Sequence, residues 1–270
     1  MPEFVIFSDL DGTLLDHRNY SFKPASKALG LISSKSIPLI LCSSKTRKEI
    51  ELYRTLLENK FPFISENGGA IFIPENYFSK KYDYNRHIGE YNVIEIGTPR
   101  EKLTSALRQI SDKTGIKIKT FSDMSALEIT ELTDLDLQTA SLAMERDYSE
   151  PFVLEDEKYT ATIEKEINQK GYMHTRGGRF HHILGGNDKG KAVRMLTDVY
   201  KSEYGDITTL GLGDSLNDLA MLKVVDIPIL IQKPDGAYDP RIKLPNLIYA
   251  QGIGPSGWNS SILNHFMKFE

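Results

Sequence analysis

The chain has 270 residues, 40% hydrophobic and 26% charged, a balance typical of a globular protein large enough for two domains. A formal net charge of −4 with no basic tail or stripe argues against nucleic acid as a partner. The single cysteine, Cys42, excludes an internal disulfide and a cysteine-based zinc site, and no apolar run reaches the roughly 20 residues of a membrane span. The sequence enters a predicted strand at once, so we expect no signal peptide, a cytoplasmic location and no membrane partner.

The first third of the chain alternates predicted strands and helices. Apolar, β-rich runs predict the strands, and helical spacing of apolar residues predicts the helices. The expected elements are strands at 4–8, 37–43 and 62–69 and helices at 23–35 and 45–60. Unbroken apolar strands with helices between them are typical of parallel sheets that are covered on both faces.

The last third repeats this pattern, whereas the middle of the chain differs from it. Helices are expected at 189–205 and 215–225, and strands at 206–214 and 226–231. Between them, partly exposed strands near 91–97, 115–121, 151–155 and 180–186 alternate with helices near 99–113, 136–147 and 156–170. We therefore predict an α/β fold: a doubly wound, parallel-sheet, Rossmann-like core of residues 1–83 and 187–270, with an inserted α+β domain at 84–186.

Polar side chains follow several of the predicted core strands. They are Asp9 and Asp11 after the first strand, Ser43 after the second, Asp214 and Asp218 after a late strand, and Lys189 at the helix that follows the insertion. Ligands of open parallel sheets gather at the carboxyl ends of the strands, so we expect these side chains to meet. Clustered carboxylates suit a hard divalent cation such as Mg²⁺, which also removes their mutual repulsion. A carboxylate whose charge is balanced in this way can attack phosphorus and form an aspartyl-phosphate.

The segments DLDGTLL and GLGDSLND, together with Ser43 and Lys189, resemble the four motifs of the haloacid dehalogenase (HAD) superfamily of phosphatases. The resemblance implies that Asp9 is the nucleophile and a metal ligand. It implies that Asp11 protonates the leaving oxygen, then activates water, and places its backbone carbonyl on Mg²⁺. Ser43 and Lys189 would hold the phosphoryl group. Asp214 would complete the metal site, and Asp218 would assist it indirectly or through water.

The inserted domain resembles the larger, C2-type α+β caps of that superfamily, and several segments resemble its mannosyl-3-phosphoglycerate phosphatase family. These segments are CSSKTRKE (42–49), ISENGGAIFIP (64–74), ELTDLDLQTASLAMERDYSEPF (131–152) and GGNDKGKA (185–192). The resemblance implies hydrolysis of 2-O-(α-D-mannosyl)-3-phosphoglycerate to phosphate and mannosylglycerate, a compatible solute. The carboxylate and hydroxyls of such a substrate call for basic and polar side chains. The candidates are Ser44, Lys45, Arg47, Asn67, Glu145, Arg146, Arg179, His182 and Asn187.

Other functions are compatible with parts of this sequence. The chain could instead be a glucosyl-3-phosphoglycerate phosphatase or a broader sugar-phosphate phosphatase. Epimeric sugars differ in one hydroxyl, so only a couple of hydrogen bonds would separate such an enzyme from a mannosyl-specific one. A catalytically silent sugar-phosphate-binding protein would not need the complete set of acidic residues and lysine. Residues 185–191 fit the G-x-x-x-x-G-K pattern of a nucleotide-binding loop, but Ala192 stands where Ser or Thr is required. The sequence does not indicate an oligomeric state.

Overall fold

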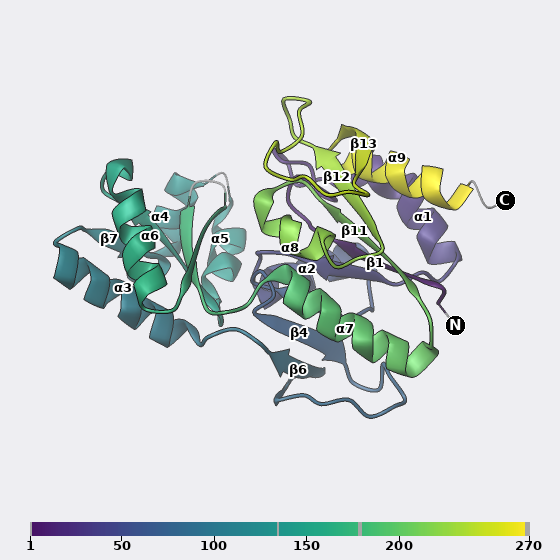
Figure 1. The fold of residues 1–270 in the computed structure, drawn as a ribbon, viewed down its shortest axis with the longest axis horizontal. Coiled ribbons are helices and arrows are strands. Elements are labelled where there is room, and N and C mark those ends of the chain that lie inside the picture. Colours follow the sequence, from purple (N-terminus) through teal and green to yellow (C-terminus); the bar gives the residue numbers. More distant parts are fainter. Residues whose placement is uncertain (1, 134, 178–179, 268–270) are drawn as a thin grey trace.

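The computed structural model describes residues 2–133, 135–177 and 180–267, and these residues form two β-sheets with helices packed against them (Figure 1). The larger sheet has nine strands in the order β13-β12-β11-β1-β2-β3-β4-β6-β5. These strands are β1 (Phe4–Ser8), β2 (Leu39–Cys42), β3 (Phe63–Ser65), β4 (Ala70–Pro74), β5 (Arg86–Ile88), β6 (Tyr91–Glu95), β11 (Thr208–Gly213), β12 (Ile227–Gln232) and β13 (Ile248–Ile253). Neighbouring strands from β13 to β3 are parallel, whereas β4, β6 and β5 add an antiparallel edge.

Hydrophobic cores lie on both faces of the larger sheet. The helices that accompany this sheet are α1 (Ser26–Ser34), α2 (Arg47–Leu56), α7 (Lys189–Tyr204), α8 (Leu219–Leu222) and α9 (Gly254–Phe266). Side chains alternate along β1, so that Ile6 belongs to the same core as Trp258 of α9, while Val5 and Phe7 belong to the other core with Leu196 of α7. All five side chains are buried. This burial fixes the register of the strands and brings their carboxyl ends to one edge.

The smaller sheet has four antiparallel strands in the order β7-β8-β10-β9. Its elements are β7 (Ile118–Thr120), β8 (Ser149–Leu154), β9 (Met173–Gly177), β10 (Phe180–Leu184), α3 (Arg100–Thr114), α4 (Ala126–Leu132), α5 (Leu137–Met144) and α6 (Thr160–Gln169). Ile183 packs with α3 and α6, whereas Phe180 packs with α4 and α5, so helices cover both faces. Within the described ranges, no helix combines the length and apolar character needed to cross a membrane.

The strand pairing differs from the predicted domain boundary at residue 84. Strands β5 and β6 lie beyond that boundary, yet they pair with β4 in the larger sheet. Tyr91 and Val93 are buried in the core of that sheet. The partly exposed pattern of this segment therefore belongs to strands near a sheet edge, which show the same alternation as strands of a small separate sheet. We propose that the inserted domain begins after β6, near residue 97, and ends before α7.

The buried carboxylate of Glu150 connects the smaller sheet to α3 and to the turn at Ser122. Glu150 on β8 is fully buried and forms an ion pair with Arg100 at the start of α3. Its oxygens also accept hydrogen bonds from Thr104 Oγ1 at 3.0 Å and from the backbone amide and Oγ of Ser122, both at 2.9 Å. Because a buried charge is costly unless it is paired and hydrogen-bonded, these contacts are required for a stable inserted domain.

Replacing Glu150 with alanine should lower the free energy of unfolding by about 3–5 kcal/mol, because one partner of a buried ion pair is removed. Urea denaturation followed by far-UV circular dichroism measures this change. Glu155→Ala, at an exposed position just beyond β8, is the matched control and should change stability by less than about 0.5 kcal/mol. Equal effects of the two substitutions would contradict the role of Glu150.

Candidate active site

The carboxyl edge of the larger sheet brings together polar residues that are far apart in the sequence. Strand β1 lies between β11 and β2, and it is parallel to both. Asp9 directly follows β1, Ser43 follows β2, and Asp214 follows β11. The backbone amide of Asp9 donates to the carbonyl of Leu212 at 2.9 Å, which ties the ends of β1 and β11 together. Asp9, Ser43 and Asp214 are all buried.

Lys189, the first residue of α7, places its ammonium between two carboxylates. Its Nζ lies 2.6 Å from Asp9 Oδ1 and 2.6 Å from Asp218 Oδ1, and the side chain is fully buried. Burial alone would lower the pKa of Lys189, but the charges of Asp218 and Asp9 outweigh it and raise the pKa above its ordinary value. The ammonium therefore stays charged and holds the loop after β1 to α7.

Asp218 uses both of its oxygens within the protein. Oδ1 accepts from Lys189, and Oδ2 accepts from the backbone amides of Asp214 at 3.0 Å and Ser215 at 3.1 Å. Asp218 therefore orients the loop that carries Asp214.

Asp9, Asp214 and Asp218 form a cluster that could hold a metal ion, because one ligand atom from each lies within 4.8 Å of the others. Burial and the charge of Asp218 raise the pKa of Asp214 to about 7. Burial also raises the pKa of Asp9 well above its usual range; Lys189 opposes this rise, and the neighbouring carboxylates add to it. One further positive charge would therefore be stabilised at this cluster.

Two glycines permit close approaches around the cluster. Gly12 has a φ of +77°, and a Cβ atom there would lie 2.9 Å from Asp214 Oδ2. Gly68 has a φ of +85°, and a Cβ atom there would lie 2.2 Å from the carbonyl oxygen of Asp188, the residue before Lys189. A larger residue at either position would displace part of the site.

Asparagine side chains connect the loop after β3 to the start of α7. Asn187 Nδ2 donates to the carbonyl oxygens of Glu66 and Asn67, each at 3.3 Å. Asn217 Nδ2 donates to Asn67 Oδ1 at 3.1 Å. Asn187 Oδ1 is buried and has no hydrogen-bond partner among the described residues. Asn67 and Asn187 are therefore joined just before the start of α7, and a contact of either with a phosphate stays a prediction.

Asp11 lies beside a second buried ammonium. Lys45 Nζ is 3.0 Å from Asp11 Oδ2 and 3.5 Å from Glu49 Oε1. Lys45 is buried, while Asp11 is half-buried. The structure thus brings Lys45, a predicted substrate contact, directly to the predicted acid and base.

Arg146 joins the inserted domain to the core. Its Nη1 donates to the carbonyl of Ser44 at 3.1 Å and to Ser149 Oγ at 3.0 Å. Glu66, from the loop after β3, accepts from the backbone amides of residues 147 and 148 at 2.8 and 3.1 Å and from Ser149 Oγ at 2.5 Å. The segment from 146 to 149 is therefore held against the core beside Ser43.

The other predicted residues of the inserted domain lie in different environments. Glu145 is exposed at the end of α5, and Arg179 lies outside the described residues. His182 is buried, and burial lowers its pKa to about 3, so its imidazole is neutral. Its neighbour His181 stacks on Phe152, with ring centroids 5.3 Å apart.

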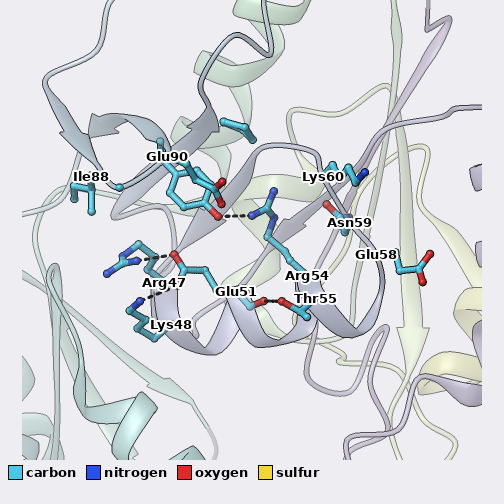
Figure 2. A pocket seen from close by; sticks show the side chains of 13 residues that line it. Arg47, Lys48, Glu51, Arg54, Thr55, Glu58, Asn59, Lys60, Ile88 and Glu90 are labelled. Carbon is cyan, nitrogen blue, oxygen red and sulfur yellow. Dashed lines mark hydrogen bonds and ion pairs between the residues drawn. The ribbon is translucent and has the colours of Figure 1, made fainter.

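Arg47 lies in a separate groove of about 890 Å³ (Figure 2). Its Nη1 is 2.6 Å from Glu51 Oε1, and Lys48 Nζ is 3.1 Å from the other oxygen of Glu51. The groove is lined mainly by α2 and the β5–β6 hairpin, and the aspartates of the metal cluster are not among its lining residues. The structure therefore does not bring Arg47 into contact with the cluster.

Glu66 and Glu49 are not among the site residues predicted from the sequence, although the sequence contains a local pattern that marks each of them. Glu66 is an acidic residue at a strand end, as Asp9 is. Glu49 is the third residue after Thr46, the spacing of a helix-capping box, and the structure contains that box at the start of α2.

Replacing Lys189 with methionine should lower the free energy of unfolding by about 3–5 kcal/mol, because two buried carboxylates lose their cation. Lys191→Met, at an exposed position on the same helix, should change it by less than about 0.5 kcal/mol. Adding Asp218→Asn to Lys189→Met should recover part of the loss, since one unpaired charge disappears. Denaturant titrations of these variants would contradict the buried pairing if Lys189→Met matched its control.

Proteins of known family are similar to this chain over most of its length. The profile of haloacid dehalogenase-like hydrolases matches residues 6–233. A protein from Methanococcoides burtonii named glucosyl-3-phosphoglycerate/mannosyl-3-phosphoglycerate phosphatase is 52% identical, with 96% of each chain covered. A protein of the same name from Persephonella marina is 45% identical, covering 96% of this chain and 95% of its own. A mannosyl-3-phosphoglycerate phosphatase from Pyrococcus furiosus is 39% identical over 84% of this chain and 90% of its own.

Solved structures share the fold at low sequence identity. A protein from Thermoplasma acidophilum has a TM-score of 0.70 at 20% identity, with 99% of each chain covered. A sugar phosphatase of HAD subclass IIB has a TM-score of 0.65 at 15% identity, covering 97% of this chain and 98% of its own. The predicted α/β fold class is confirmed. Taken with the profile match and the relatives at 52% and 45% identity, these results show that the chain belongs to the haloacid dehalogenase-like hydrolases.

Proposed function

We propose that this chain is a Mg²⁺-dependent phosphatase that hydrolyses 2-O-(α-D-mannosyl)-3-phosphoglycerate to mannosylglycerate and phosphate. The observation that carries the proposal is the buried contact of Asp9 with Lys189 beside Asp214, which combines a nucleophile, a cation for phosphate and an acidic metal site. The substrate follows from the names of the relatives. The chain would act in the cytoplasm, in the synthesis of mannosylglycerate as a compatible solute.

The residues at the edge of the sheet fit a bound Mg²⁺. Asp9 and Asp214 would supply carboxylate oxygens, Asp11 its backbone carbonyl, and Asp218 would hold the loop. The fit rests on the chemistry of this donor set, since hard oxygen ligands suit Mg²⁺ and the buried carboxylates of Asp9, Asp214 and Asp218 lie close enough to share one ion. When bound, the cation would neutralise charge on the phosphoryl oxygens.

The side chains can perform both halves of the hydrolysis. Asp9 attacks phosphorus as a carboxylate, and the bond from phosphorus to the glycerate oxygen breaks. Asp11 donates its proton to that oxygen, so the alcohol leaves neutral and Asp11 becomes a carboxylate. Asp11 then takes a proton from the water that attacks the aspartyl-phosphate, which releases phosphate and restores Asp9 and Asp11. Ser43 and Lys189 hold the phosphoryl oxygens during both steps.

We further propose that Arg146 binds the substrate's carboxylate from the inserted domain. Arg146 reaches the carbonyl of Ser44, next to the phosphate-binding Ser43. Its Nε and His182 Nδ1 are buried without hydrogen-bond partners among the described residues, so both can still bind a ligand. A guanidinium pairs with a carboxylate through strong, directional hydrogen bonds. The contacts expected for Ser44, Lys45, Arg47, Asn67, Glu145, Arg179 and Asn187 stay predictions.

Glucosyl-3-phosphoglycerate is a second candidate substrate, because the relatives at 52% and 45% identity carry both substrates in their names. Glucose and mannose differ in the orientation of one hydroxyl. A site separates such epimers only through the few hydrogen bonds made to that hydroxyl.

Phosphate release across a substrate panel tests the proposal. The panel contains mannosyl-3-phosphoglycerate, its glucosyl analogue and common hexose phosphates, with Asp9→Asn as the blank. We expect kcat/KM on the mannosyl substrate to exceed that on hexose phosphates at least about tenfold. EDTA should abolish turnover and Mg²⁺ should restore it. Metal-free turnover would refute the role of the cation, and retention of about a tenth of the activity by Asp9→Asn would refute the nucleophile.

Replacing Arg146 with alanine should lower kcat/KM for mannosyl-3-phosphoglycerate about 30- to 1,000-fold, because a buried charged contact is lost. The loss on p-nitrophenyl phosphate, which lacks a carboxylate, should stay below about threefold. Arg176→Ala, at an exposed arginine of the same domain, is the control. Equal losses on the two substrates would place Arg146 in domain docking alone.

A further inference from the structure

The two carboxylate oxygens of Asp11 have different surroundings. Oδ2 lies 3.0 Å from the ammonium of Lys45. Oδ1 is buried and has no hydrogen-bond partner among the residues that the structure describes. A carboxyl group can turn about its Cβ–Cγ bond and exchange these positions. The contact with Lys45 fixes the plane of the carboxyl group, because intermediate angles would take both oxygens away from the ammonium.

Lys45 is itself held in place from several sides. Only 6% of its surface is exposed. Its ammonium lies 3.5 Å from Glu49 Oε1, and it lies 5.1 and 5.7 Å from the ring centroids of Tyr20 and Tyr53. The carboxylates of Asp11 and Glu49 lie close enough to balance the buried charge of its ammonium.

Glu49 is fixed in turn by the start of α2. Thr46 donates its backbone amide to Glu49 Oε2 at 2.9 Å, and the amide of Glu49 donates to Thr46 Oγ1 at 3.1 Å. This capping box leaves Oε1 directed at Lys45. Thr46 Oγ1 also donates to the carbonyl of Leu142 in the inserted domain at 2.9 Å. A continuous set of contacts therefore runs from the inserted domain through the helix cap and Lys45 to Asp11.

We propose that Lys45 is a positioning residue that holds Oδ2 of Asp11 so that Oδ1 faces the leaving oxygen. This role rests on the proposed phosphatase function, in which Asp11 transfers a proton to the leaving oxygen. Because Oδ2 accepts from the ammonium, the acid form of Asp11 carries its proton on Oδ1. When the bond between phosphorus and the leaving oxygen breaks, this proton moves from Oδ1 to that oxygen. Lys45 itself touches neither the phosphorus nor the leaving group.

This positioning role differs from the role that the sequence indicates for Lys45, which is a direct contact with the substrate's carboxylate. In the structure Lys45 is buried, and its ammonium already lies between the carboxylates of Asp11 and Glu49. The two roles separate experimentally, because only a positioning role makes the importance of Lys45 depend on how strongly the leaving group needs a proton.

Two phosphate esters without a carboxylate test the proposal in the full-length chain with Mg²⁺. Benzyl phosphate releases an alkoxide that must be protonated, whereas p-nitrophenyl phosphate releases a stable anion. The parameter is kcat/KM, which includes the steps up to the first bond cleavage and leaves out the later attack of water. Lys45→Met should reduce kcat/KM about 100-fold for benzyl phosphate and less than about threefold for p-nitrophenyl phosphate.

Matched variants separate positioning from folding. Lys45→Arg keeps a cation for Oδ2 and should retain the wild-type ratio of the two esters. Lys45→Gln keeps a hydrogen-bond donor but loses the charge. If Lys45→Met does not fold, Lys45→Gln takes its place, and its kcat/KM should fall more for benzyl phosphate than for p-nitrophenyl phosphate. Lys48→Met, at a partly exposed position in the first turn of α2, should leave both values unchanged.

Other outcomes would overturn the proposal. Equal losses on both esters would indicate a purely structural role for Lys45. A loss confined to mannosyl-3-phosphoglycerate would indicate binding of the substrate's carboxylate. The wild-type substrate profile tests the phosphatase function separately, since the variant ratio on the two esters does not depend on which sugar the enzyme prefers.

Discussion

The ammonium of Lys189 lies 2.6 Å from one oxygen of Asp9 and one of Asp218, and the rest of the site is arranged around this contact. Lys189 is 180 residues from Asp9 in the sequence, so no local structure can bring them together. The parallel sheet places the end of β1 beside the end of β11, and α7 begins close to both strand ends. Buried carboxylates at this density are stable only if positive charge is buried with them. Lys189 supplies part of that charge, and burial together with the charge of Asp218 still raises the pKa of Asp214 to about 7.

Consecutive residues of the loop after β3 contact two different parts of the molecule. Glu66 binds the backbone of residues 147 and 148 in the inserted domain, whereas Asn67 accepts from Asn217 beside the acidic cluster. Both have positive φ values, so the chain turns sharply here and directs neighbouring side chains apart. A displacement of the inserted domain would therefore be transmitted to the cluster through one short loop. This loop therefore links the segment proposed to bind the substrate to the cluster proposed to transfer the phosphoryl group.

Sequence reasoning succeeded where the information is local. Asp9 and Asp214 each follow an apolar strand within a few residues, and the carboxyl edge of a parallel sheet is where such side chains meet. It reaches less far where the role of a residue depends on its partner in the fold. Lys45 reads as a free cation for an anionic substrate, because the sequence does not show that Asp11 and Glu49 flank it. Arg47 reads the same way, although α2 turns it toward Glu51 in a separate groove. Strand β6 reads as part of the insertion because a strand near the edge of a large sheet and a strand of a small sheet share the same alternating pattern.

The charge balance of the site also constrains the order of events. Each ammonium near the phosphate position is already paired, Lys189 with Asp9 and Asp218, and Lys45 with Asp11 and Glu49. With Asp214 included, the carboxylates of this edge outnumber the ammonium groups of Lys189 and Lys45. The chain as a whole is also acidic. An anionic sugar phosphate approaching this edge alone would be repelled. A cation or a proton that reduces this negative charge would therefore favour the binding of the proposed substrate.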